Sequence, residues 1–120
     1  MAGPTRVTDY LESAAQAAAF QQKVIANNIA NLNTPGFRRQ TLSFQAVLGE
    51  AMREGKTVDA DQLSRAVVQT GKGPINDRGN DVDLDVEIGE LIKSAGRYKS
   101  CVRMLNRMYR QMEQAMTGLE

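Results

Sequence analysis

The strongest constraint on the fold is a repeat of apolar residues over the last third of the chain, from residue 84 to 117. Their spacing alternates between four and three residues, the repeat of a helix that buries one narrow seam against a partner helix. The repeat predicts a packing seam made of Leu84, Ile88, Leu91, Ala95, Tyr98, Val102, Leu105, Tyr109, Met112 and Met116. At about 1.5 Å per residue such a helix reaches on the order of 50 Å. This length favours a rod or a bundle of several chains over a small compact domain.

The charges of the same segment support a helix over residues 81–118. Acidic residues crowd its start and basic residues lie toward its end, which suits the helix macrodipole. Asp81 or Asp83 can serve as N-cap, and Gly118 is a natural stop. The basic residues fall away from the seam. We interpret them as a solvated outer face, with docking to an acidic neighbour or to lipid as the second interpretation.

A second long helix is predicted over residues 4–33, where Pro4 suits the first turn. Its apolar residues also recur every three or four positions, and many of them are alanines that let another backbone approach closely. The predicted seam of this helix contains Leu11, Ala14, Ala18, Ile25 and Ile29. We therefore expect a mainly all-α fold in which the two terminal helices pair as an antiparallel coiled coil.

The first helix should stop sharply before residue 36. Pro35 pushes the residue before it out of the helical region, and Gly36 permits a positive φ. The asparagines just before this stop predict a helix end held by side-chain hydrogen bonds, within or between chains. An ordinary polar helix end is the alternative. The predicted assembly turn comprises Asn27, Asn28, Asn31, Thr34, Pro35, Gly36 and Phe37.

The middle segment, residues 34–80, has weaker signals. Residues 38–42 read as extended, and a short amphipathic helix should begin at Phe44 and end at Gly55. Asp59 and Gln62 can cap another helical turn. A short strand is expected within residues 65–70, followed by a loop over residues 71–80 that is rich in Gly, Asn and Asp.

The composition argues against a catalytic or metal-binding function for this chain. Its 120 residues form one domain at most and contain no histidine, so nucleophile–histidine pairs and ordinary zinc sites cannot be built. The single cysteine, Cys101, is expected to be an apolar filler. Asp81, Asp83 and Asp85 imitate the start of a calcium loop, but Val86 and Ile92 stand where Gly and Glu are required. We expect no catalytic residue, no metal, no cofactor and no small-molecule substrate.

Two stretches resemble a known family. Residues 26–37 match the signature near the N-terminus of bacterial flagellar rod and hook proteins, and residues 80–87, followed by Arg97-Tyr98, are similar to the FlgB family of proximal rod proteins. The short length also fits that family, whereas distal rod and hook proteins are longer. The other short proximal rod subunit is the alternative within this superfamily.

The resemblance implies a structural subunit of the flagellar basal-body proximal rod. Its terminal helices would assemble into the helical drive shaft that joins the membrane ring to the distal rod and hook. Implied partners are other rod proteins, membrane-ring and export-apparatus components, and further copies of the chain. The implied location is the periplasmic part of the basal body, reached from the cytoplasm without a cleaved signal peptide.

Two other classes compete with this interpretation. A helical adaptor or export-chaperone-like module could use the same seam and would form a discrete, folded dimer. A nucleic-acid binder could use the arginines of the last helix, but a net charge of +1 gives it no global electrostatic drive. For a rod subunit we expect the isolated chain to be partly disordered at its ends and to finish folding among its neighbours.

Overall fold

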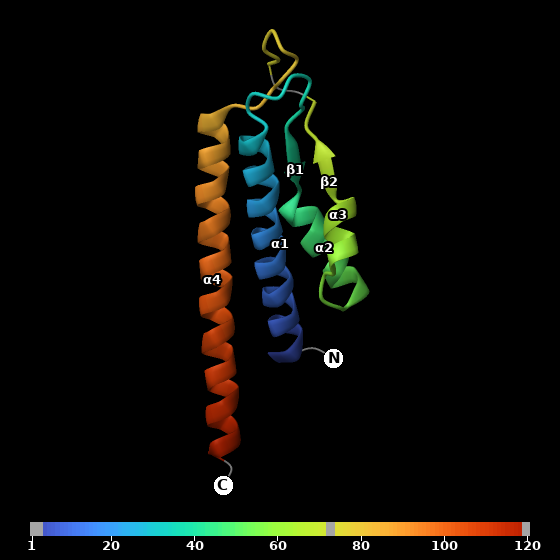
Figure 1. Ribbon diagram of the computed structural model, residues 1–120. Helices are drawn as coiled ribbons and strands as arrows, with labels where there is room; N and C mark the ends of the chain where they lie inside the picture. The colour runs from blue at the N-terminus through green and yellow to red at the C-terminus, as the bar shows by residue number, and fades with distance from the viewer. Residues whose placement is uncertain (1–3, 72–73, 119–120) are drawn as a thin grey trace.

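A computed structural model describes residues 4–71 and 74–118 of the protein. Its two long helices, α1 (Pro4–Ala30) and α4 (Leu84–Thr117), lie side by side and run in opposite directions (Figure 1). The molecule measures 68 × 25 × 17 Å. Its radius of gyration of 17.8 Å exceeds the value of about 14 Å that a compact domain of this length would have. The prediction of a mainly helical fold with two paired terminal helices is confirmed.

Helix α1 forms the central layer of the molecule. On one side it packs against α4, and on the other it carries β1 (Gln40–Leu42), α2 (Phe44–Glu54), α3 (Ala60–Arg65) and β2 (Val67–Gln69) (Figure 1). The core of this second side is apolar and consists of Ala17, Leu42, Val47, Ala51, Val58 and Leu63, with Phe20 and Phe44 packed against it. The small side chains of α1 let both neighbouring layers approach its backbone closely.

Helix α1 ends at Ala30, three residues before the expected position. The backbone N–H of Leu32 donates to the carbonyl oxygen of Ile29 at 3.1 Å, so the chain tightens into a turn with three-residue spacing. The side chain of Asn31 donates to the carbonyl oxygen of Asn27 at 2.8 Å. The asparagines therefore end the helix by competing for its backbone groups.

Helix α4 begins directly after Asp83, which is its N-cap and accepts a hydrogen bond from the backbone N–H of Asp85 at 3.0 Å. Asp81, the other capping candidate, lies outside the helix. Gly118 follows the last helical residue, and its N–H donates to the carbonyl oxygen of Gln114 at 2.8 Å. Both ends of the helix lie within the predicted span of residues 81–118.

Local signals in the middle segment also correspond to the observed elements. Ser43 caps α2, and Gly55 ends it with a φ of 70° in the left-handed region. Asp59 and Gln62 form the reciprocal capping box of α3. Pairing of the two short strands was not predicted: β1 and β2 are antiparallel, with Thr41 opposite Val68.

Candidate assembly interface

A buried polar junction joins α1, β1 and the start of α4. At its centre the side chain of Asn28 is fully buried. Its amide nitrogen donates to the carbonyl oxygen of Gln40 at 2.8 Å, and its amide oxygen accepts from the N–H of Gln40 at 3.0 Å. The Asn28 amide thus pairs with the backbone of β1 as a neighbouring strand would. It fixes the strand against the helix without requiring another strand.

The second half of the junction is Glu87, whose side chain is also completely buried. One carboxylate oxygen accepts from the Asn28 amide at 2.8 Å, and the other is paired with the Nε of Arg39. A buried carboxylate is costly unless it is paired and hydrogen-bonded, and here both oxygens have partners. The three side chains come from α1, the segment before β1 and α4. Their contacts therefore set the position of α4 along α1.

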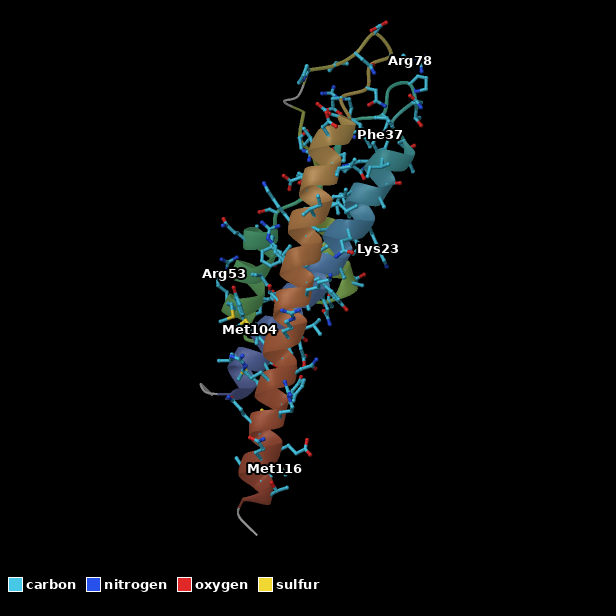
Figure 2. All side chains as sticks on the ribbon, turned by 90° about the vertical axis from the view of Figure 1, so that its left-hand side faces the viewer. Lys23, Phe37, Arg53, Arg78, Met104 and Met116 are labelled. Atoms are coloured by element: carbon cyan, nitrogen blue, oxygen red, sulfur yellow. The ribbon has the colours of Figure 1, made fainter. Side chains whose placement is uncertain are left out.

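A latch formed by Asn80 holds the turn after α1 to the loop before α4. Its buried amide nitrogen donates to the carbonyl oxygens of Asn31 and Thr34, both at 2.9 Å. Its amide oxygen accepts from the N–H of Val82 at 2.7 Å. The backbone N–H of Gly36 also donates across to the carbonyl oxygen of Arg78 at 2.7 Å. Figure 2 shows Phe37 and Arg78 at this same end of the molecule.

Two glycines make the crossing at this latch possible. Gly36 and Gly79 have φ values of 77° and 75°, a region that other residues rarely adopt. A Cβ added at Gly79 would lie 3.6 Å from the Cα of Gly36, so the two turns are in contact. The positive φ expected at Gly36 is confirmed.

A second ion pair lies beside the junction. The backbone N–H of Arg39 donates to one carboxylate oxygen of Asp81. The other oxygen lies 3.3 Å from the Nε of Arg38, close enough for an ion pair but without the alignment of a hydrogen bond. Asp81 therefore anchors the segment before β1, which is the role the structure gives it instead of the helix cap.

Farther along the helix pair, Gln21 links three elements. Its side-chain nitrogen donates to the carbonyl oxygen of Leu42 in β1 at 3.1 Å. Its oxygen accepts from the hydroxyl of Ser94 at 3.1 Å and from Arg97 at 3.3 Å, both on α4. The Ser94 hydroxyl has a single proton, and the carbonyl oxygen of Ala18, at 2.8 Å, shares it with the Gln21 oxygen. Polar contacts thus extend the junction toward the middle of the pair.

The residues of the predicted assembly turn have different surroundings. Asn28 is buried, and Asn31 and Phe37 are half-buried, whereas the exposed members are Asn27, Thr34, Pro35 and Gly36. The structure brings this turn together with residues 80–87. Its exposed members are available for contact with other chains, and that role remains a prediction.

The predicted seam residues are also distributed unevenly. On α1, Leu11, Ala14, Ala18 and Ile25 are buried, and Ile29 is half-buried. On α4, Leu105 is buried; Leu91, Ala95, Val102 and Met112 are half-buried; and Leu84, Ile88, Tyr98, Tyr109 and Met116 are exposed. Near the start of α4 the line facing α1 runs through Glu87, Leu91 and Ser94. A strict seven-residue repeat drifts by about 20° per repeat around a straight helix, which explains the offset. Whether Leu84 and Ile88 pack in an assembly of several chains remains a prediction.

Sequence reasoning missed the polar partners of the junction: Arg39, Asn80, Asp81, Glu87 and Ser94. A signal for some of them was present. Asn28 follows Ile25 at a spacing of three, and Glu87 and Ser94 flank Leu91 at four and three, so polar residues share a face with the predicted seams. Polar side chains on the buried faces of two helices indicate partners across the interface.

Nothing in the described part of the chain groups the side chains that a metal site would need. No cluster of three acidic or sulfur ligands occurs within residues 4–71 and 74–118. The Cys101 thiol is half-buried, and burial raises its pKa, which disfavours the reactive thiolate. No helix of these residues has the length and apolar character that a membrane crossing demands. The arrangement is suited to holding helices in register.

Comparisons with known proteins point to one group of proteins. Residues 9–38 match the family model described as "Flagella basal body rod protein", a match that contains the whole turn after α1. The flagellar basal body rod protein FlgB of Bacillus subtilis is 30% identical over 117 residues, which cover 90% of this chain and 91% of that protein.

Two further relatives show where the similarity is complete and where it is partial. FlgB of Proteus mirabilis is 28% identical over 114 residues, with 77% of this chain and 80% of the relative covered. The rod protein FlgG of Caulobacter vibrioides is 35% identical over 92 residues, but these represent only 29% of its length against 74% of this chain. The similarity to FlgB therefore extends over nearly whole chains, whereas that to FlgG covers one part of a longer protein.

Proposed function

The chain belongs to the FlgB family of flagellar basal body rod proteins, and from this premise we propose that it builds the proximal part of the rod through its two terminal helices. The single observation that carries the proposal is the near full-length similarity to the FlgB protein of Bacillus subtilis. Its function is structural, as a subunit of the basal body rod.

The shape of the molecule supports assembly through the helix pair. An elongated pair of helices with a maximal extent of 68 Å can lie along the axis of a rod. Several aliphatic side chains of α4 remain exposed in the single chain, namely Leu84, Ile88 and Ile92. Apolar side chains grouped on one helix are typical of surfaces that bind other proteins. Heterologous contacts between such surfaces produce open helical assemblies when the rotation between neighbouring copies does not close into a ring.

We further infer that the partners of the chain are other rod subunits, further copies of itself, and components of the membrane ring and the export apparatus. The relatives with rod and hook-associated names support the first of these. The inferred location is the rod in the periplasmic space, which the chain reaches through the flagellar export route. A purely mechanical, non-catalytic role is consistent with the half-buried Cys101 thiol.

Complementation with a tagged subunit tests this function. Deleting the gene in its source bacterium should abolish swimming, and the tagged full-length chain should restore it and appear in purified basal bodies at the base of the rod. A variant with Leu105→Asp places a charge in the α1–α4 interface and should fail to restore swimming. The proposal would be rejected if basal bodies of the deletion strain contained complete rods.

A further inference from the structure

One end of the elongated molecule carries an apolar cup, which we call the head. It is a cavity of about 710 Å³ between the loop at residues 74–83 and the first turn of α4. Three aliphatic side chains in its lining are partly exposed: Ile75 at 51%, Val86 at 45% and Leu84 at 40%. Asp83, another lining residue, is exposed and adds negative charge, as does the nearby Asp85. The head therefore suits an apolar segment with positively charged neighbours.

The opposite end of the molecule has the complementary character, and we call it the tail. Helix α4 extends past the beginning of α1, and Met116 lies near its free end (Figures 1 and 2). The apolar line that faces α1 continues into this end through Tyr109, Met112 and Met116, with Met116 exposed at 71%. Methionine is flexible and fills irregular apolar spaces.

The charges of the tail are mostly opposite to those of the head, although the exposed Glu113 between Met112 and Met116 is acidic. All charged residues between Leu91 and Met112 are basic, and Arg107 and Arg110 are exposed near the tail. The two ends lie at opposite extremes of a molecule 68 Å long, so one chain cannot bring its own tail to its own head. Only another molecule can join them.

We propose that the tail of one copy binds in the head of a second copy, with Met112 and Met116 in the cup formed by Ile75, Leu84 and Val86. Arg107 and Arg110 of the first copy then approach Asp83 and Asp85 of the second. This contact deepens the proposed function, on which it rests, because it specifies surfaces through which copies join end to end. The two patches differ, so the contact is heterologous and leaves a free head and a free tail at the ends of each chain of copies.

The head offers three apolar side chains and the tail two, so the contact should be weak. Interfaces below about 1,200 Å² of buried surface typically belong to transient complexes. The charged pairs are exposed at the rim, so added salt should weaken association. Sedimentation velocity over a range of protein concentrations is therefore a suitable measurement, and the sedimentation coefficient of the full chain should rise with concentration and fall again with salt.

Three variants, each with two apolar residues replaced by glutamine, test the head and the tail individually. The head variant is Leu84→Gln with Val86→Gln, and the tail variant is Met112→Gln with Met116→Gln. Glutamine is a good helix former and changes no charge, so both variants should retain the helix content of the original chain in circular dichroism. The control is Ile92→Gln with Met104→Gln, two exposed residues of α4 between the ends. Of the three variants, only the control should still show a sedimentation coefficient that increases with protein concentration.

Mixing the head and tail variants gives the sharpest result. Each has lost one end, but the mixture still offers one intact head and one intact tail, so it should form a dimer and nothing larger. The proposal is overturned if either variant alone associates as the original chain does, or if the mixture remains monomeric. Restoration of swimming by the full-length chain tests the rod function separately, so a failure of this contact is distinguishable from a failure of the function.

Discussion

The two halves of the α1–α4 pair are held together by different chemistry. Near the start of α4 the buried side chains of this helix are polar, and Glu87 is held by hydrogen bonds with Asn28 and Arg39. Near the end of α4 the contact is apolar, with Leu105 as the buried side chain of α4 and Leu11 and Ala14 among those of α1. The half near the start of α4 is held by hydrogen bonds between specific side chains. The half near the end of α4 is held by apolar contact with the small side chains of α1.

The difference indicates a division of labour between register and affinity. Apolar contacts are non-directional, and alanines on α1 leave few side chains that would resist sliding of one helix along the other. A buried carboxylate with two required partners allows only one arrangement, because any shift leaves charged or polar atoms without partners. We conclude that the polar junction determines the register of the pair and that the apolar half contributes most of its favourable burial.

Removing the carboxylate should have the largest effect. Glu87→Ala leaves the Asn28 amide and the Arg39 guanidinium without their partner, and the free energy of unfolding should fall by about 3–5 kcal/mol. Urea unfolding followed by circular dichroism measures this change. Glu90→Ala is the matched control on the same helix, because Glu90 forms only an exposed ion pair with Lys93 at 3.7 Å. A control loss as large as that of Glu87→Ala would show that the junction is not special.

Creating a cavity in the apolar half of the helix pair should lower the free energy of unfolding. Leu105→Ala removes the buried leucine of α4, and the free energy of unfolding should fall by about 2–3 kcal/mol. Met104→Ala next to it removes an exposed side chain and should change that free energy by less than about 0.5 kcal/mol. Equal losses in urea unfolding would contradict the orientation of α4 in the structure.

The latch should be weaker than either half of the pair. Asn80→Ala removes the donor to Asn31 and Thr34 and should cost about 1–2 kcal/mol in unfolding free energy. The exposed Asn33 offers a control, since Asn33→Ala should cost less than about 0.5 kcal/mol. Hydrogen exchange of the turn at residues 31–37 should accelerate in the first variant alone. If hydrogen exchange of this turn were unchanged in Asn80→Ala, the hydrogen bonds of Asn80 would not stabilise the turn.

Substituting two glycines should change the free energy of unfolding by smaller amounts and with opposite signs. Gly36 has a φ of 77°, so Gly36→Ala should destabilise the chain by about 1 kcal/mol. Gly96 lies inside α4 with open space around it, so Gly96→Ala should stabilise the chain by about 0.5–1 kcal/mol. Thermal unfolding measures both, and the same sign for the two substitutions would count against the turn geometry.

The smallest expected effect concerns the apolar half at high pH. The Tyr109 hydroxyl donates to a carboxylate oxygen of Glu12 at 2.6 Å, and this hydrogen bond raises the pKa of Tyr109 above its usual value of 10.0. The raised pKa favours the protonated phenol. The contact's contribution is therefore complete below the pKa of an unfolded tyrosine and is lost as the pH rises through the folded value.

Ultraviolet absorbance of tyrosinate measures this titration. Tyr109→Phe identifies the step that belongs to this residue, and Glu12→Gln should lower its pKa toward the usual value because the carboxylate is gone. A step at the same pH with and without Glu12 would exclude the hydrogen bond as its cause.

The elements that were predictable from sequence depend on neighbouring residues. The end of α2 at Gly55, the capping box of Asp59 and Gln62, and the start of α4 after Asp83 all arise within one turn of the chain. The junction could not be predicted in this way, because Asn28 and Glu87 are separated by 59 positions. The pairing of β1 with β2 was missed for the same reason. A spacing of three or four residues indicates which face of a helix is buried. It does not identify the residue across the interface that pairs with a buried polar side chain.

A double-mutant cycle between Asn28 and Glu87 tests the junction most directly. The free energies of unfolding of the original chain, Asn28→Ala, Glu87→Ala and the double variant would be measured in urea with a constant amount of a stabilising osmolyte. If the two side chains fix the register together, the losses should be non-additive by about 1–3 kcal/mol, with the double variant less destabilised than the sum. Losses that add to within about 0.5 kcal/mol would mean that the two residues act independently and that the register has another origin.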